Sequence, residues 1–276
     1  MSSRVIGVVI PTTDNSFFSS FAYQAEKYLH ASGYQVLICS SANDAEREKE
    51  YLKLLSGLGA EGIICISGLQ SLPEDLLPES YPLVWVDRVP ESARIIPWVA
   101  NDDEKAMESA VDYLIGKGCR NILLAPGYLA ENQDSPRVAG YRKALSTAGM
   151  EYHEEYVLKR KGAGTSEAET ELLVKKCLEE GFDVDGIITS SDRAAFGAMA
   201  ALRSVGLYVP EDAKLITFDN SPYSSAAGTP ITALDRNPGQ LTEKACEILL
   251  KELSGVKNIS IENEIPVSIV ERDSTR

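Results

Sequence analysis

The chain has 276 residues, of which 44% are hydrophobic and 25% are charged, and its formal net charge is −14 at pH 7. This composition is that of a globular protein with room for two domains of ordinary size. The negative charge argues against DNA binding by the chain itself, because affinity for nucleic acid depends on clustered lysine and arginine.

Apolar segments rich in valine and isoleucine alternate along the chain with segments of helical periodicity, which is typical of βαβ units. We expect strands at 5–10, 34–40, 62–67, 82–87, 121–125, 185–190 and 214–219. Most of these segments are apolar throughout, as parallel strands covered on both faces should be. All are far shorter than the roughly 20 residues of a membrane span, so no contact with a membrane is expected.

Helices are predicted between the strands, and several carry clear start or stop signals. Their expected ranges are 17–32, 44–58, 102–117, 135–148, 166–180, 192–205 and 239–253. A glycine follows five of them directly, where a left-handed backbone favours this residue: Gly33, Gly118, Gly149, Gly181 and Gly206. Ser135 and Pro136 fit an N-cap followed by proline in the first turn, which places Arg137 at the start of its helix.

The number of strand–helix units predicts two lobes. About four units precede Asp102 and about four follow it, which is too many for one ordinary open sheet. We therefore expect an α/β fold with two doubly wound parallel-sheet lobes. No low-complexity linker separates them, so several short crossovers should join them.

Polar and aromatic residues cluster where the predicted strands end, and ligands of open parallel sheets bind beyond the carboxyl ends of the strands. This rule selects Phe17, Phe18, Asp87, Arg88, Arg137, Ser191, Asp192, Asp219 and Asn220. Carboxylates and arginine can each bond two neighbouring hydroxyls, while an aromatic ring covers a C–H face. The set therefore suits a sugar held in a cleft between the lobes.

Each candidate also has a plainer structural interpretation. Asp192 is explained as well by a helix N-cap, and Asp219 by the end of a strand. One of the two phenylalanines is expected in the core, and Arg137 can simply pair with a nearby carboxylate.

Signals for catalysis, a metal or a cofactor are few. The sequence has no G-x-x-x-x-G-K-[ST], G-x-S-x-G or H-E-x-x-H motif, and it has only two histidines. Its five cysteines lie far apart without zinc-ligand spacing, which is typical of cytosolic thiols; Cys39 and Cys65 are expected to be buried in strands. We expect no metal, no cofactor and no enzyme, although a glycosidase built on carboxylates remains an alternative.

Many short motifs follow one another along the chain: IGVVIP at 6–11, FF at 17–18, VDR at 86–88, NDD at 101–103, RVAGY at 137–141, DGII at 185–188, SD at 191–192, AFGAM at 195–199, GLYVPED at 206–212, FDN at 218–220, TPIT at 229–232 and VERDST at 270–275. Their order and spacing resemble the effector-binding region of the lactose-repressor (LacI/GalR) family of bacterial transcription regulators. The resemblance implies a fold like that of periplasmic sugar-binding proteins, with residues 1–101 and 236–262 in the N-terminal lobe and 102–235 and 263–276 in the C-terminal lobe.

The resemblance also implies a set of ligand contacts. They fall on Phe17, Phe18, Arg137, Ser191, Asp192 and Asp219, and less securely on Asp87 and Arg236, whose positions vary with the effector. Some relatives carry asparagine in place of Ser191 and glutamine in place of Arg236, so the effector is not identified by these residues. We expect Arg137→Ala or Asp219→Ala to abolish effector binding with little loss of stability.

The same resemblance implies a cytoplasmic regulator, and a repressor in the simplest case, that binds a small-molecule effector and forms a homodimer. The sequence begins at the first strand, without the family's helix-turn-helix, so operator DNA is expected to contact only a missing N-terminal head. The alternative is the sugar-binding protein of a transport system, which shares the fold.

Overall fold

The computed structural model describes residues 3–69, 81–93, 95–125, 135–159 and 166–276. It divides into two compact units, and the chain passes between them three times. The first unit contains Met1–Asn101 and Asn237–Ile265, and the second contains Asp102–Arg236 and Pro266–Arg276. This division puts Arg236 in the second unit, where it contacts Asp219. Residues 263–265 fall in the first unit because the strand Glu262–Glu264 pairs there.

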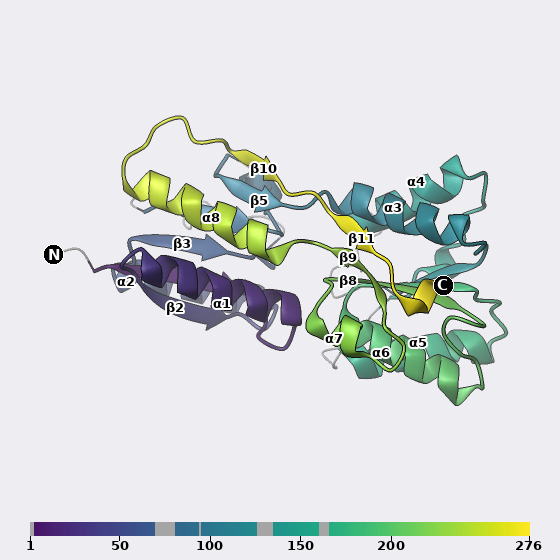
Figure 1. The fold of residues 1–276 in the computed structure, drawn as a ribbon. Helices are drawn as coiled ribbons and strands as arrows, with labels where there is room; N and C mark the ends of the chain where they lie inside the picture. Colours follow the sequence, from purple (N-terminus) through teal and green to yellow (C-terminus); the bar gives the residue numbers. More distant parts are fainter. Residues whose placement is uncertain (1–2, 70–80, 94, 126–134, 160–165) are drawn as a thin grey trace. The chain divides into compact units, whose positions relative to one another are not determined.

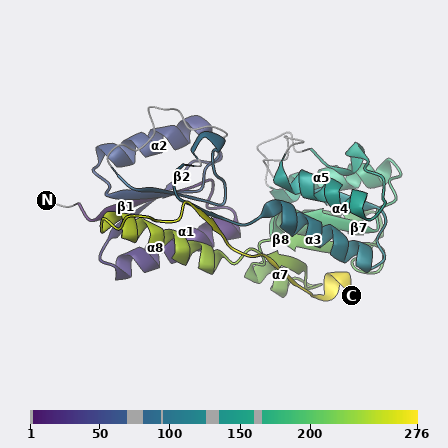
Figure 2. The same cartoon turned by 90° about the horizontal axis from the view of Figure 1, so that it is seen from above.

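The first unit is a parallel sheet with helices on both faces. Its strands are β1 (Val5–Ile10), β2 (Gln35–Ser40), β3 (Gly62–Cys65), β4 (Leu83–Val86), β5 (Trp98–Ala100) and β10 (Glu262–Glu264). They lie in the order β10-β5-β4-β3-β1-β2, and all neighbouring pairs are parallel. Figure 2 shows α2 (Ala45–Gly57) on one face, and α1 (Ser16–Ala31) and α8 (Pro238–Leu253) on the other.

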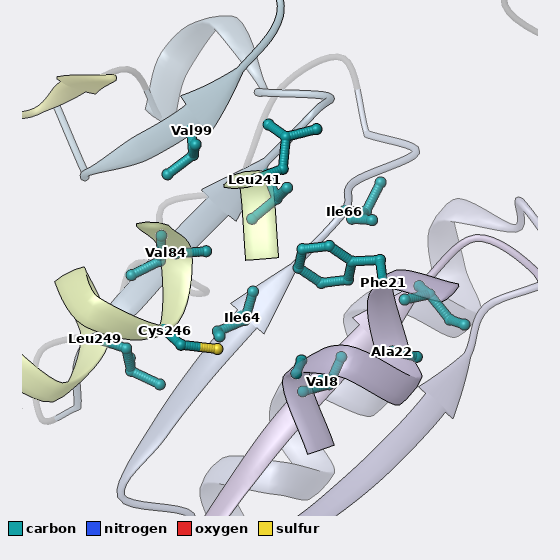
Figure 3. Close-up of a cluster of buried hydrophobic side chains, with 14 of the residues drawn as sticks. Val8, Phe21, Ala22, Ile64, Ile66, Val84, Val99, Leu241, Cys246 and Leu249 are labelled. Carbon is teal, nitrogen blue, oxygen red and sulfur yellow. The ribbon is translucent and has the colours of Figure 1, made fainter. Parts of the chain in front are cut away.

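Alternating side chains of these strands fill two cores. Val8, Ile64 and Val84 point toward α1 and α8, where Figure 3 shows them among Phe21, Leu241, Cys246 and Leu249. Their chain neighbours Val9, Ile63 and Trp85 instead join the core beneath α2. Both faces of the central strands are therefore buried, which explains their continuous apolar sequence.

The edge strand β2 departs from that rule. Leu37 and Ile38 are 40% and 45% exposed, and Cys39 is only partly buried, whereas Cys65 on β3 is fully buried. The expected burial is thus confirmed for Cys65 and wrong for Cys39, because β2 has a neighbouring strand on one side only.

The second unit repeats this architecture with one antiparallel strand. Its strands are β6 (Ile122–Ala125), β7 (Gly186–Thr189), β8 (Lys214–Phe218), β9 (Thr232–Asp235) and β11 (Ser268–Val270). Its helices are α3 (Asp103–Gly116), α4 (Pro136–Thr147), α5 (Ser166–Glu179), α6 (Asp192–Ser204) and α7 (Pro222–Ala226) (Figure 1). The strand order is β11-β9-β8-β7-β6, and β11 is antiparallel to β9.

Side chains of the second sheet alternate between two helix layers in the same way. Leu124, Ile188 and Ile216 share a core with α3 and α4. Their neighbours Leu123, Ile187 and Leu215 share the other core with α5 and α6. Phe218, at the end of β8, belongs to the first of these two cores.

The predicted fold class is confirmed, with two mainly parallel sheets covered by helices. All seven predicted strands and seven predicted helices are present within two residues of their expected ends. The strands β5, β9, β10 and β11 and the short helix α7 were not predicted, because each has only three to five residues and shows no clear periodicity. Among the described helices, none combines the length and apolarity needed to cross a bilayer.

Candidate functional site

The strand order of the second unit determines where its loops can form a site. An isolated parallel bridge joins Leu124 of β6 to Val157, so β6 has a neighbour on the side opposite β7. The connections that follow β6 and β7 therefore lead to opposite sides of the sheet, and ligands of such sheets bind at this switch point. Arg137 follows β6 at the start of α4, and Asp192 follows β7 at the start of α6.

Arg137 is positioned by a helix cap, an ion pair and an aromatic ring. The Ser135 side chain accepts a hydrogen bond from the Val138 N–H with proline in the first turn, which confirms the predicted cap. The Nε of Arg137 donates to Asp103 Oδ2 at 2.9 Å, and its guanidinium carbon lies 3.7 Å from the centroid of the Phe218 ring. The plainer interpretation of Arg137, an ion pair with a nearby carboxylate, is therefore confirmed.

The ion pair leaves part of the Arg137 guanidinium available. Asp103 accepts from Nε and, at 3.5 Å, from Nη2, which uses two of the five N–H donors of an arginine. The Arg137 side chain keeps 20% of its surface exposed. A group held flat on an aromatic ring with donors still accessible is well suited to bind neighbouring oxygen atoms.

Asp219 directly follows β8 and is paired with a buried arginine. The Nη1 of Arg236 lies 3.5 Å from Asp219 Oδ1, and the two side chains are only 4% and 3% exposed. Arg236 itself follows β9, so the strand ends of two neighbouring strands supply the pair. The expectation that Asp219→Ala leaves stability nearly unchanged therefore conflicts with this geometry, because the substitution removes a carboxylate partner from a buried cation.

Asp192 is the most unusual carboxylate of the second unit. It is 1% exposed; its Oδ2 accepts from the Ser221 N–H at 3.1 Å, while its Oδ1 has no hydrogen-bond partner. Burial is the main cause that raises the pKa of Asp192, and the charge of the nearby Asp219 adds to it; against the lowering effect of Ser221 and Arg272, the pKa comes to about 6. A buried acceptor without a partner among the described residues calls for an explanation, and an external hydrogen-bond donor is one.

Ser191, and not Asp192, is the N-cap of α6. Its side chain accepts from the Ala194 N–H, and its hydroxyl lies 3.4 Å from that of Ser166. The N-cap interpretation of Asp192 is therefore wrong, since Asp192 is the first helical residue and bonds to a different segment. Because its hydroxyl already caps the helix, Ser191 offers less to a ligand than its neighbour does.

The first unit gathers a second set of predicted residues beyond the carboxyl ends of its strands. Phe17 and Phe18 are both buried and meet edge to face with centroids 5.5 Å apart. Both belong to the core beneath α1, although only one was expected there. The Arg88 guanidinium lies 5.1 Å from the Phe18 ring centroid and donates to Asn43 Oδ1 at 3.2 Å.

Asp87 stands between β4 and Arg88 in a left-handed backbone conformation, with φ of 63°. Its Oδ2 lies 3.9 Å from Arg88 Nε. Asp219, which follows β8, also has a positive φ, of 88°. Non-glycine residues rarely adopt this conformation, and those that do cluster at binding sites.

The structure thus brings together two separate sets. Arg137, Asp192, Asp219 and Arg236 belong to the second unit and are linked through Phe218 and Ser221. Phe17, Phe18 and Asp87 belong to the first unit and are linked through Arg88.

Several residues that contribute to these sets were not predicted. Asp103 could have been found, because it lies in the first turn of a helix that follows a strand. Arg272 lies within the motif at 270–275, but the sequence does not connect it with the strand ends, and the buried Glu48 gave no sequence signal. Glu48 accepts from the Gly68 N–H at 2.6 Å, and burial raises its pKa.

We expect Asp192→Asn to change how the stability of the second unit depends on pH. Because the folded-state pKa is raised, the native protein binds more protons than the unfolded chain between pH 4 and 6, so its stability falls as pH rises through this window. The loss amounts to about 3 kcal/mol and should be absent from the variant.

Urea denaturation from pH 4 to pH 8 measures this effect. Asp112→Asn, on the exposed side of α3, is the matched control and should follow the wild-type profile. Parallel profiles for the wild type and Asp192→Asn would contradict a buried, titrating Asp192.

Comparisons with known proteins identify the type of domain. Residues 3–226 match the family model described as periplasmic binding proteins and sugar binding domain of LacI family. The chain is 27% identical over its whole length to the HTH-type transcriptional repressor PurR of Vibrio campbellii. It is 29% identical over 99% of its length to catabolite control protein A of Priestia megaterium. The matched region covers 82% of each of these two relatives.

Solved structures agree with these sequence relatives. The transcription regulator CcpA of Lactococcus lactis is 25% identical, has a TM-score of 0.86 and overlaps 99% of both chains. A periplasmic binding protein/LacI transcriptional regulator from Alkaliphilus metalliredigens, complexed with D-xylulofuranose, is 26% identical, has a TM-score of 0.84, and overlaps 99% of this chain and 100% of that one. This chain therefore belongs to the family of periplasmic binding proteins and LacI-type sugar-binding domains, as the effector-binding domain of a LacI-family transcriptional regulator.

Proposed function

We propose that this chain binds a small sugar or related polyol as the effector of a transcriptional repressor. The observation that carries the proposal is the unsatisfied, buried Oδ1 of Asp192, beside the Asp219–Arg236 ion pair at the strand ends of the second unit. A hydroxyl group can donate to this oxygen and accept from an arginine at the same time. Vicinal hydroxyls of a sugar therefore match the set.

The aromatic and cationic residues of the first unit support the same ligand class. The Phe17 and Phe18 rings are buried beside this set, and Asp87 and Arg88 supply its polar atoms from the end of β4. The sugar in the complex of the Alkaliphilus metalliredigens relative supports this choice of ligand class.

The regulatory part of the proposal follows from the relatives and from charge. Several relatives are named as helix-turn-helix repressors, and a chain of net charge −14 is a poor ligand for DNA. Operator contact is therefore assigned to a helix-turn-helix head and not to these residues. The effector acts by its different affinity for the two states of the regulator.

We also propose that the chain acts as a homodimer in the cytoplasm. Oligomers of identical chains are mostly two-fold dimers, and two identical effector domains would couple two DNA-reading heads. Sedimentation velocity at micromolar concentration should give the mass of a dimer. A monomer there would contradict this part of the proposal alone.

A thermal-shift screen tests the ligand class. Pentoses, hexoses, disaccharides, nucleosides and purine bases are each added to the folded protein, and a ligand at 100 times its Kd should raise the free energy of unfolding by about 2.7 kcal/mol. A shift with one sugar supports the proposal and identifies the effector. Shifts with nucleosides or purines alone, or with no compound, contradict it.

Arg137→Ala should weaken binding of the sugar found in that screen by tenfold to a hundredfold. A hydrogen bond to a charged group contributes about 1.5–3 kcal/mol, and each 1.4 kcal/mol changes Kd tenfold. Isothermal titration calorimetry measures the change. The matched control is Arg203→Ala, an exposed arginine in the last turn of α6, which should bind like the wild type. Equal affinity of the wild type and Arg137→Ala would remove Arg137 from the site.

A further inference from the structure

The loop after β8 holds an unfavourable backbone conformation at the centre of the candidate site. Asp219 and Asn220 follow each other with φ of 88° and 52°, and neither is glycine. Left-handed conformations of such residues persist only where the surroundings hold them. The contacts that hold this turn therefore also determine where the Asp219 carboxylate lies.

Two side chains hold the turn from different segments. On one side, Asp192 at the start of α6 accepts a hydrogen bond from the Ser221 N–H at 3.1 Å. On the other side, Arg272 from the C-terminal segment donates through Nη2 to Asn220 Oδ1 at 2.6 Å. The Nη1 of Arg272 donates at 2.8 Å to the Ile231 carbonyl, so its guanidinium spans both ends of the segment that joins β8 to β9.

The backbone of Arg272 is itself firmly anchored. Its N–H donates to Thr232 Oγ1 at 2.8 Å, and the Thr232 hydroxyl donates to the Arg272 carbonyl at 3.1 Å. Ser274 and Thr275 are fully buried, and the Ser274 hydroxyl donates to the Leu215 carbonyl at 2.6 Å. Figure 1 shows this C-terminal segment beside β9 of the same unit. The guanidinium is therefore attached to the sheet and not to a free chain end.

We propose that Arg272 is a positioning residue of the effector site, whose guanidinium holds the Asp219–Asn220–Ser221 turn in its left-handed form. This inference rests on the proposed function, because the turn matters to the effector only if Asp219 and Asp192 bind it. The turn carries Asp219 and keeps the Ser221 N–H hydrogen-bonded to Asp192. Arg272 acts through these residues and not by touching the effector.

The charge of Arg272 acts on the site together with its hydrogen bonds. Of the groups that face Asp192, Asp219 at the end of β8 raises its pKa, whereas Ser221 and Arg272 lower it. Loss of the positive charge should therefore raise the pKa of Asp192 above about 6. Lysine would keep the charge, but it cannot reproduce the two-pronged geometry of a guanidinium.

Ligand-free NMR on three variants tests the proposal. In Arg272→Gln, the Ser221 amide should exchange with solvent at least tenfold faster than in the wild type, and the titration midpoint of the Asp192 carboxyl carbon should rise. In Arg272→Lys, exchange should accelerate while the midpoint stays at its wild-type value. Arg276→Gln, four residues along the same segment and exposed, should change neither quantity.

Two results would overturn the proposal. One is an unchanged exchange rate of the Ser221 amide in Arg272→Gln. The other is an acceleration shared equally by the Ile188 and Ile216 amides in the strands, because Arg272 would then serve only general stability. Both quantities are read without effector, so the outcome does not depend on whether the effector is a sugar.

Discussion

Asp219→Ala should lower the free energy of unfolding of the second unit by about 3–5 kcal/mol, the usual cost of removing one partner from a buried ion pair. The Arg236 side chain is 4% exposed and would lose a carboxylate 3.5 Å away. The expected loss of stability is large because Arg236 would stay buried, at a high desolvation cost, without the carboxylate that compensates its charge. The intact ion pair itself contributes little net stability.

A double substitution separates the ion pair from other roles of Asp219. Asp219→Ala combined with Arg236→Met removes both charges, and we expect it to recover most of the lost stability. Urea denaturation followed by circular dichroism measures both variants, and any second transition is fitted separately, because proteins of more than one domain often depart from two-state unfolding. A single variant within 1 kcal/mol of the wild type would show that Arg236 does not depend on this carboxylate.

The sequence predicted the long elements well because each has a strong local signal. Strands such as β1 and β8 are apolar on both faces, and α1 and α6 have regular apolar spacing. The strand β9, four residues long, owes its place to pairing with β8 and β11, which lie on either side of it. Long-range pairing of this kind leaves no periodicity in the sequence.

The sequence indicated which residues lie at the strand ends, but it did not indicate which other residues these would contact. Strand ends identified Arg137, Asp192 and Asp219 because the fold requires polar loops at that edge of the sheet. Partners such as Asp103 for Arg137 depend on how α3 packs against α4, which is a tertiary contact. Arg272 is 53 residues from Asp219 along the chain, so only the folded structure reveals its contact with the turn.

The contacts of the candidate site hold it in place, but they also lower the stability of the ligand-free chain. Asp192 keeps a carboxyl oxygen buried without a partner, and two successive residues adopt left-handed conformations beside it. Both features destabilise the ligand-free chain. An effector that satisfies Asp192 would offset part of this cost, and binding would then be strongest in the state where the carboxylate is charged.

Gly140→Ala should be among the most damaging single-methyl substitutions in the second unit. A Cβ atom at Gly140 would collide with the Glu104 carbonyl oxygen of α3, and it would also crowd the Cβ of Met107 at 3.1 Å. The obstacle is backbone, so α4 must move away from α3. Overpacking of this kind costs about 1–3 kcal/mol.

The same substitution should weaken effector binding, because Gly140 lies one turn after Arg137 and its close approach to α3 sets the 2.9 Å contact of Arg137 with Asp103. Gly116→Ala, in α3 with no atom within 4 Å of the added Cβ, is the matched control and should be neutral or slightly stabilising. Urea denaturation and calorimetry with the effector measure both variants. Wild-type stability of Gly140→Ala would mean that α3 and α4 tolerate separation, and the position of Arg137 would then have to depend on Phe218 and the Ser135 cap alone.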